Sequence, residues 1–505
     1  MSATADGLDT SHLQRDLGRR SLRGGTIAFA SQLVRFAAQF AATALLARLL
    51  TPETFGLVAM AGSIAIILDM VKEFGLSAAT IQREEISQAQ VSTLFWINIA
   101  ISLGIAAALM LVAPLLAAFY GQPELTGITR WLAAGFIASG ATVQHWALLR
   151  RQMRFGTIAL LETSAELTAA AIAIALAWHG AGYWALVVQR LLAAALMLIG
   201  SWLLCAWRPG FAVTTAGLRD MLGFGASVTG FGLISVAARS VDQILIGWLW
   251  GPVTLGLYER AAKLLLVPVN NLNAPLYAVA MPALSRLQDQ PIRYRNGFLL
   301  VFEKFAMVTM PVAAGAIATA DWIVVLLFGP HWAAAAVYVA CFAAAAAVLP
   351  VTLAAALLYQ TQNRSGEMLR AGLADAVLVV GAIAAGLPFG ATGVAVAYAV
   401  AGPLLRLPAA FWLAGRKGPV STADLFAGIV PAAAAAVATP VAIWWLRQTT
   451  AFSGLGAFAG LMVAMAVGLI VTATVYLALP RSRRALTTAW QLMRSHAVAG
   501  ATGPG

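Results

Sequence analysis

About 14 long apolar runs follow one another along this chain, and they restrict its possible folds more than any other feature. A helix needs about 20 mainly apolar residues to cross a bilayer, and runs of that length recur between residues 24 and 479. Hydrophobic residues make up 61% of the sequence and charged residues only 10%, whereas a soluble domain carries about 25% charged residues. The sequence therefore predicts an all-α polytopic membrane protein.

The connecting loops indicate how the helices are oriented. The predicted spans are residues 24–46, 55–80, 92–118, 126–147, 157–178, 182–206, 221–247, 254–281, 298–325, 333–360, 368–387, 391–414, 424–446 and 454–479. Loops, tails and adjoining span ends on one side hold 21 of the 32 Lys and Arg residues, and those on the opposite side hold three. Basic residues accumulate on the cytoplasmic side, so we expect cytoplasmic N- and C-termini and no cleaved signal peptide. The same distribution explains the net charge of +12 without a nucleic-acid partner.

An internal repeat predicts two related halves. The segment TPETFGL at residues 51–57 aligns without a gap with GPVTLGL at residues 251–257, and four of the seven residues are identical. The offset spans six predicted helices, an even number, so the halves share one orientation. We expect two pseudo-symmetric six-helix lobes plus two extra C-terminal helices. The expected parts are a basic N-tail (1–23), an N-lobe (24–206), a cytoplasmic linker (207–220), a C-lobe (221–414), helices 13–14 (424–479) and a cytoplasmic C-tail (480–505).

A polar stripe in the first run contains the first candidate site residue. Charge at membrane depth is costly, and it usually marks a transport pathway or a buried pair. Gln32, Arg35 and Gln39 share one helix face because they lie three and four residues apart. The stripe predicts a water-filled cavity that contains Arg35; a structural ion pair is the alternative.

More charges surround the second copy of the repeated motif. Arg239 and Asp242 have pairing distance along a helix; alternatively, Arg239 offers its charge to an anionic substrate while Asp242 positions it or exchanges protons. Glu259 and Lys263 have the i,i+4 spacing of an ion pair, which would leave Arg260 as the uncompensated cation.

The run that carries Lys263 also contains Asn270 and Asn271, between Pro268 and Pro275. Proline removes a backbone hydrogen bond, and interrupted helices line the substrate sites of transporters. We therefore expect this helix to be kinked or broken.

Two other clusters lie in the first half. Asp69 and Lys72 have pairing distance near the predicted cytoplasmic mouth, where they predict a structural network. Glu162 and Glu166 lie one turn apart, so that repulsion would favour protonation of one of them; a pair with Arg190 is the alternative.

Neither a cofactor nor a metal is expected. The sequence contains no P-loop or other nucleotide motif, and its five histidines show no metal-ligand spacing. The two cysteines, Cys205 and Cys341, lie far apart in apolar runs and predict neither a disulfide framework nor a metal site.

Five segments carry a resemblance to a known family. They are VSTLFWIN (91–98), LLRRQMRF (148–155), GYWALV (182–187), DQILIGWLWGPVTLGLYERA (242–261) and MPALSRLQDQPIRYR (281–295). In this order they resemble the Wzx-type oligosaccharide flippases, in particular the colanic-acid-like exopolysaccharide exporters. The resemblance extends over about residues 20–420.

This resemblance implies a fold and a function. The family belongs to the multidrug/oligosaccharidyl-lipid/polysaccharide exporter superfamily, with two six-helix lobes and two extra helices. Its members flip undecaprenyl-pyrophosphate-linked oligosaccharide repeat units across the bacterial inner membrane for exopolysaccharide or lipopolysaccharide biosynthesis, without hydrolysing ATP. A polysaccharide polymerase and export machinery are the expected partners.

The resemblance also implies a cationic cavity, in which each candidate residue has a role. The expected pyrophosphate-binding residues are Arg35, Arg239, Arg260 and Lys263. The candidates for ion coupling are Asp242 and Glu166, with a proton, sodium or the membrane potential as the driving force. The supporting polar residues are Gln32, Gln39, Asp69, Lys72, Arg190, Asn270 and Asn271.

Two other functions are alternatives to this prediction. A multidrug/cation antiporter of the same superfamily would usually have 12 helices and a cavity dominated by carboxylates, whereas this chain has more predicted spans and several intramembrane Arg and Lys residues. A membrane glycosyltransferase or polymerase would usually present catalytic residues on large outer loops, and the outer loops here are short. We expect a transporter and not an enzyme.

Overall fold

The computed structural model describes residues 17–73, 77, 80–81, 86–211, 218–449 and 455–483. Helices account for the regular structure in these ranges, and the described chain contains no strand. It divides into two compact units, Met1–Gly256 and Leu257–Gly505. This boundary lies inside the predicted C-lobe.

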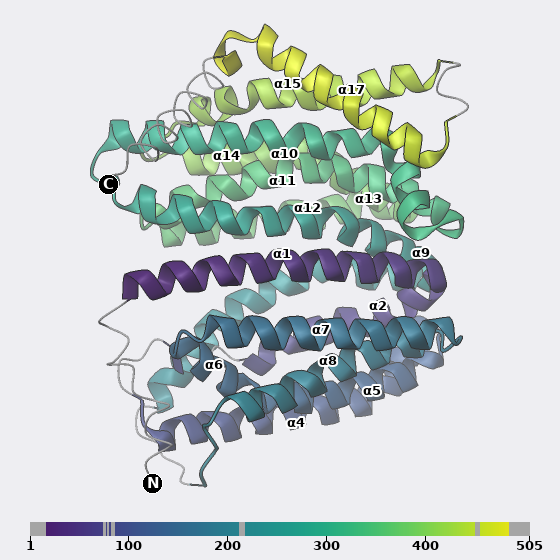
Figure 1. Cartoon of the computed structure of the whole chain (residues 1–505), viewed down its shortest axis with the longest axis vertical. Coiled ribbons are helices and arrows are strands. Elements are labelled where there is room, and N and C mark those ends of the chain that lie inside the picture. Colours follow the sequence, from purple (N-terminus) through teal and green to yellow (C-terminus); the bar gives the residue numbers. More distant parts are fainter. Residues whose placement is uncertain are drawn as a thin grey trace, which may run out of the picture. The chain divides into compact units, whose positions relative to one another are not determined.

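The described part of the first unit contains seven helices and the beginning of an eighth, and Figure 1 shows their arrangement. They are α1 (Leu17–Leu49), α2 (Pro52–Glu73), α4 (Gln88–Tyr120), α5 (Glu124–Gly140), α6 (Val143–Arg151), α7 (Phe155–Trp178), α8 (Tyr183–Leu204) and α9 (Leu218–Ser285). Within this unit α1 packs on α7, α7 on α8, and α4 on α5.

The second unit contains the rest of α9 and the later helices. These are α10 (Pro291–Phe328), η2 (Pro330–Ala335), α11 (Ala336–Thr361), α12 (Ser365–Gly386), η3 (Leu387–Phe389), α13 (Gly390–Ala401), η4 (Gly402–Arg406), α14 (Leu407–Gly415), α15 (Thr422–Arg447) and α17 (Ala457–Ala478). Its core includes Tyr294, Phe298, Phe302, Tyr359 and Phe411, all of which are buried.

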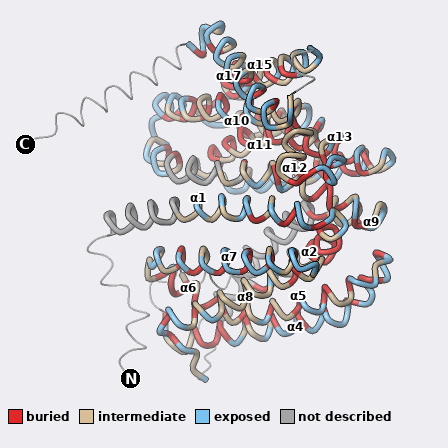
Figure 2. The backbone as a smooth tube through the Cα atoms, turned by 45° about the vertical axis from the view of Figure 1, so that its right-hand side comes forward, coloured by how far each residue is buried: buried red, intermediate tan, exposed pale blue. Residues whose placement is uncertain are grey.

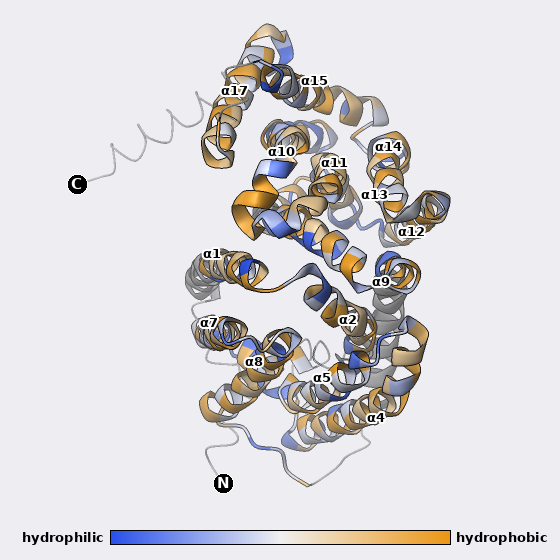
Figure 3. Ribbon diagram, turned by 90° about the vertical axis from the view of Figure 1, so that its right-hand side faces the viewer, coloured by the Kyte–Doolittle hydropathy of each residue, from blue (hydrophilic) through white to orange (hydrophobic). Residues whose placement is uncertain are grey.

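Apolar side chains on the long helices face outward. On α4, Leu111 is 76% exposed, and on α17, Leu469 is 69% exposed. Figure 2 shows exposed residues along both helices, and Figure 3 shows that hydrophobic residues predominate on α17. Such surfaces are unfavourable in water but compatible with lipid chains. Ten helical segments of the described chain are long and apolar enough to cross a membrane, so the protein is a multi-pass membrane protein.

The described residues of the predicted spans are mainly helical, although the total of 14 stays a prediction; residues 74–76, 78–79 and 454 lie outside the described residues. The spans 221–247 and 254–281 are the two arms of α9, which turns at Gly251 with φ 79° and ψ −178°. The helical backbone continues past Pro268 and Pro275, so the helix is not broken there, and a kink stays a prediction. A membrane helix can accommodate a proline when neighbouring groups satisfy the freed carbonyl, whereas the conformation at Gly251 requires glycine.

The two copies of the repeated motif cross each other at their glycines, within the first unit. An ideal Cβ placed on Gly56 would lie 1.7 Å from the carbonyl oxygen of Pro252, and one placed on Gly256 would lie 1.9 Å from that of Pro52. The contact is therefore reciprocal: the glycine of each motif packs on the proline of the other. Small residues allow such close approach of two backbones in membrane proteins, which explains why both copies keep glycine at this position.

A second pair of matched contacts supports the internal repeat. Arg154 donates from Nη1 to the carbonyl oxygen of Leu204 at 2.9 Å, and Arg364 donates from Nη1 to that of Ala414 at 3.1 Å. The residues before these arginines, Met153 and Asn363, both have φ 54°. Each arginine thus satisfies a carbonyl at the C-terminal end of a helix of its own unit.

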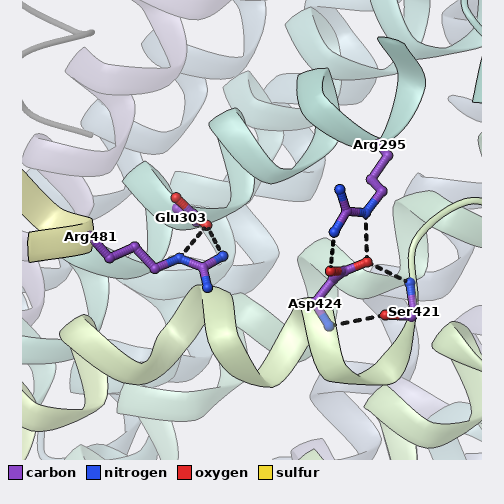
Figure 4. Close-up of polar contacts among 5 residues, drawn as sticks. All are labelled: Arg295, Glu303, Ser421, Asp424 and Arg481. Atoms are coloured by element: carbon purple, nitrogen blue, oxygen red, sulfur yellow. Dashed lines mark hydrogen bonds and ion pairs between the residues drawn. The ribbon is translucent and has the colours of Figure 1, made fainter. Parts of the chain in front are cut away.

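The last two helices, α15 and α17, are anchored to α10. Figure 4 shows Arg295 of α10 with Asp424 of α15, and Glu303 of α10 with Arg481, which follows α17. The Arg295 Nε–Asp424 Oδ2 distance is 2.8 Å and the Arg481 Nη2–Glu303 Oε1 distance is 2.6 Å.

A third ion pair ties the C-terminal end of α15 to the C-terminal half of α10. The Arg447 Nη2–Asp321 Oδ2 distance is 2.6 Å, and the guanidinium lies 4.0 Å from the centre of the Trp322 ring. Ion pairs on both ends of α15 therefore fix the extra helices on the second unit.

Replacing Gly56 by alanine is expected to destabilise the first unit. The new methyl group would meet a backbone carbonyl, which no side-chain rotation can move, and overpacking costs about 1–3 kcal/mol. Thermal unfolding in detergent micelles should show a lower midpoint for Gly56→Ala and for Gly256→Ala. The control is Gly104→Ala on α4, where an ideal Cβ has no neighbour within 4 Å. Equal midpoints in all three variants would contradict the reciprocal crossing.

Asp424 is expected to matter more than its partner Arg295. Asp424 pairs with Arg295 and also completes the capping box of Ser421 at the start of α15. An exposed ion pair contributes about 0–1 kcal/mol, and an N-terminal cap contributes about 1 kcal/mol. Hydrogen exchange should show a greater loss of protection at the first turn of α15 in Asp424→Ala than in Arg295→Ala. Equal losses in the two variants would show that the ion pair, and not the cap, holds this end.

Candidate functional site

Arg35 lies in a polar cluster between α1 and α7, within the first unit. Its Nη1 donates to Oε2 of Glu162 and its Nη2 donates to Oε1 of Gln32. Its Nε lies 3.9 Å from Oε2 of Glu166. The structure thus brings together residues of the predicted stripe and the predicted carboxylate pair. Arg35 and Glu162 lie 127 positions apart in sequence.

The remaining residues predicted near Arg35 lie in different surroundings. Gln39 is exposed on α1. The guanidinium of Arg190 on α8 lies close to Gly62 on α2, 2.9 Å from an ideal Cβ there. Of the predicted partners, the carboxylates of α7 lie beside Arg35. Spacing along one helix did not predict this pairing, because it joins two separate helices.

Glu259 of α9 holds two cations in the second unit. Arg260 donates from Nε to its Oε2 at 2.8 Å, and Lys263 Nζ forms an ion pair with Oε1. The Glu259 side chain is only 4% exposed. Since a buried carboxylate is stable only when its oxygens are satisfied, one Glu serves both neighbours. The prediction that Arg260 is uncompensated is wrong: adjacent helical residues seldom face each other, and the spacing rule overlooked this contact.

A third cluster joins α2 to α5. Lys72 Nζ lies 2.6 Å from Oδ1 of Asp69 and 3.0 Å from Oγ of Ser139. Lys72 is buried, and Asp69 is exposed. These contacts agree with a local network that includes Lys72, while any role of the two residues in transport stays a prediction.

Several predicted residues cannot be placed in full. The side chains of Arg239 and Asn270 lie outside the described residues, so the predicted Arg239–Asp242 pair stays a prediction. Asp242 accepts a hydrogen bond at Oδ1 from the backbone N–H of Gln243 at 2.8 Å. Asn271 is half-buried on α9.

One intramembrane pair in the second unit had no sequence pattern to indicate it. Arg406 donates from Nε to Oδ1 of Asp375 at 2.7 Å and from Nη2 to Oδ2 at 3.0 Å. Its guanidinium also lies 5.3 Å from the centre of the Tyr398 ring. Arg406 ends η4, a π-helical turn between α13 and α14, and it lines a small cavity together with Leu266. Turns of this type recur at functional sites.

The described residues contain no group of three or more His, Cys, Asp or Glu side chains that could hold a metal ion. Cys205 and Cys341 are both free thiols. Cys205 follows α8 and is buried. A buried thiol in apolar surroundings is a poor nucleophile, which favours a packing role for this residue.

The clusters differ in their balance of charge. The Arg35 cluster has one cation and two carboxylates, whereas the Glu259 cluster has one carboxylate and two cations. Chemically, each can bind or exchange ions, because oppositely charged groups at membrane depth respond strongly to an added charge.

Comparison with protein families gives a match over more than half of the chain. The family model described as "Polysaccharide biosynthesis protein" matches residues 45–337. Among curated proteins, the chain is 31% identical to the teichuronic acid biosynthesis protein TuaB of Bacillus subtilis, over 54% of this chain and 56% of that one. It is 26% identical to the lipopolysaccharide biosynthesis protein WzxC of Escherichia coli, over 57% and 59% of the two chains.

A third relative is the succinoglycan biosynthesis transport protein ExoT of Rhizobium meliloti, with 26% identity over 59% of this chain and 60% of that one. The matched segments thus span little more than half the length of these relatives. The family match ends at residue 337. It therefore includes neither α15 and α17 nor the C-terminal tail.

Solved structures show the same fold. The lipid II flippase MurJ, in an inward closed conformation, superposes with a TM-score of 0.69 at 14% identity, over 90% of this chain and 98% of that one. An inward-facing multidrug resistance MATE family transporter of the MOP superfamily gives a TM-score of 0.51 at 14% identity, over 79% and 95%. The chain therefore has the fold of these transporters, with MurJ the more similar of the two.

Removing the carboxylate of Glu259 is expected to destabilise the second unit strongly. Breaking a buried ion pair by removing one partner costs about 3–5 kcal/mol, and Glu259→Gln would leave two cations without their counter-ion. Thermal unfolding should show a much lower midpoint for Glu259→Gln than for Lys263→Gln, because the Lys263 side chain is 43% exposed. Similar small shifts in both variants would show that Glu259 is not needed to hold the pair.

Proposed function

Because this chain belongs to the polysaccharide biosynthesis protein family, we propose that it is a flippase. Its substrates would be undecaprenyl-pyrophosphate-linked oligosaccharide repeat units, and it would move them across the bacterial inner membrane by alternating access. The product would enter exopolysaccharide or lipopolysaccharide biosynthesis. The observation that carries this proposal is Arg35 in the predicted span 24–46 of a chain with the fold of MurJ, since a charge at membrane depth usually marks a transport pathway or a buried pair.

The chemistry of the substrate fits such a residue. A pyrophosphate carries at least two negative charges, and its oxygens must be compensated when it leaves water. Arginine stays charged and makes bidentate contacts with phosphate oxygens. Arg239, Arg260 and Lys263 are the other proposed cations of this site, with the Glu259 cluster supplying an excess of positive charge.

The proposed cycle has three parts. The cations bind the pyrophosphate from the cytoplasmic side, the lobes then expose it to the opposite side, and the polyprenyl tail stays in lipid throughout. A proton or sodium ion on Asp242 or Glu166, or the membrane potential, returns the protein to its first state. In this proposal both termini lie in the cytoplasm, and a polysaccharide polymerase or export machinery receives the product.

The protein is proposed to be a transporter and not an enzyme, since its relatives and its fold are those of transport and biosynthesis proteins. The alternative is a multidrug/cation antiporter, which the similarity in fold to a MATE family transporter suggests. The higher TM-score of the lipid II flippase and the cations of the Glu259 cluster favour the flippase.

Binding measurements on Arg35→Gln test the proposed site. Purified protein should bind undecaprenyl pyrophosphate, and Arg35→Gln should bind it at least about tenfold more weakly, because a hydrogen bond to a charged group contributes about 1.5–3 kcal/mol. Arg447→Gln is the matched control, since Arg447 is paired with Asp321 far along the chain from the proposed cations. Equal affinities in the two variants would remove Arg35 from the site, and preferential binding of an organic cation such as tetraphenylphosphonium would favour the antiporter.

A further inference from the structure

The guanidinium of Arg35 contacts three side chains of its own chain. One Nη atom donates to Glu162 and the other to Gln32, while Nε lies near Glu166. An anionic substrate that binds both Nη atoms competes with Glu162 and Gln32 for this guanidinium. Displacement of one of these partners would leave the guanidinium open to an anion.

The charges of the cluster oppose direct addition of a substrate. With Glu162 and Glu166 ionised, the three side chains carry a net charge of −1. A pyrophosphate that approached them would be repelled at short range, and repulsion between charges is strong where water is scarce. Binding of the anion thus requires that a carboxylate moves away or takes up a proton.

The exposure of the side chains indicates which carboxylate can move. Glu162 is 24% exposed and Glu166 is 43% exposed, whereas Glu259 of the second cluster is only 4% exposed and holds two cations. A partly exposed carboxylate can turn toward water without being left uncompensated. Both carboxylates of α7 have this route, and Glu162 is the one that accepts a hydrogen bond from Arg35, so the contact of Glu162 is the one that an anion would replace.

Other charged side chains lie on the helices that pack against α7. The helices packed on α7 are α1, α6 and α8. Besides Arg35, their described charged or titratable side chains are Arg48 on α1, His145, Arg150 and Arg151 on α6, and Tyr183 and Arg190 on α8. None of these described residues is a carboxylate, so Glu162 and Glu166 are the carboxylates in this setting.

We propose that Glu162 is the internal counter-ion of Arg35 and that the pyrophosphate headgroup binds by displacing it. Glu162 is a positioning residue: it holds Arg35 in the absence of substrate and sets how tightly an anion can bind. This inference rests on the proposed function and specifies how its anion site works. Loss of the Glu162 charge should therefore strengthen anion binding, whereas loss of a merely structural contact would weaken or not change it.

Calorimetric titration with inorganic pyrophosphate tests the proposal on the purified full-length chain in nanodiscs. Glu162→Gln should bind pyrophosphate about tenfold more tightly than wild type, because the competing charge is gone. Arg35→Gln should lose the binding, and Glu166→Gln should show a smaller gain since Glu166 lies farther from the guanidinium.

Asp321→Asn is the matched control, because it also removes the carboxylate partner of an arginine, Arg447. Its pyrophosphate affinity should equal that of wild type. An equal gain in this variant would show that any released arginine binds the anion, and would overturn the assignment to Glu162.

Unchanged or weaker binding by Glu162→Gln, with a wild-type unfolding midpoint, would also overturn the proposal. If Glu162→Gln does not fold, Glu162→Asp replaces it: a shorter carboxylate reaches Arg35 less well, so its affinity for pyrophosphate should rise, and no rise would overturn the proposal. Tighter pyrophosphate binding by Glu162→Gln together with absent transport of a pyrophosphate-linked lipid would support the counter-ion and contradict the proposed function.

Discussion

The structure depends on the neutralisation of charge inside apolar helices. Hydrocarbon cannot solvate a guanidinium or a carboxylate, so each such group needs a partner from another helix, another turn or water. Three solutions occur in the described chain: Arg35 reaches Glu162 across two helices, Glu259 collects two cations along one helix, and Arg406 forms a bidentate pair with Asp375 at a π-helical turn. Charge pairing thus stabilises the fold. The same charged groups are the ones for which an ionic substrate would compete.

The internal repeat is the second feature that organises the fold. The two copies of the seven-residue motif meet at Gly56 and Gly256, where each backbone packs on the proline carbonyl of the other copy. Arg154 and Arg364 repeat a helix-capping contact in their respective units. The charged clusters do not repeat in this way: the Arg35 cluster has excess carboxylate and the Glu259 cluster has excess cation. The related halves therefore carry clusters of different net charge.

The fold was more predictable than the site. Apolar runs of bilayer length located the helices because lipid imposes this length on every span, and the repeated motif pointed to the residues of the glycine crossing. Spacing along one helix found Gln32 beside Arg35, and Lys263 beside Glu259. It could not find Glu162 beside Arg35 or Asp375 beside Arg406, since these pairs depend on how separate helices pack. It also misjudged Arg260, because a buried carboxylate, Glu259, pairs with the residue next to it. A break at Pro268 was one of two outcomes that the prolines predicted, and the helix continues there.

The central claim is that this protein moves a pyrophosphate-linked oligosaccharide between leaflets with the help of Arg35. The most direct measurement uses proteoliposomes that contain fluorescent undecaprenyl-pyrophosphate oligosaccharide and an external glycosidase. With wild-type protein and an imposed proton, sodium or voltage gradient, the account predicts that lipid in one leaflet exchanges with the other, and that Arg35→Gln slows this exchange to the rate of protein-free vesicles. Exchange by wild-type protein at the protein-free rate under all three gradients would contradict it.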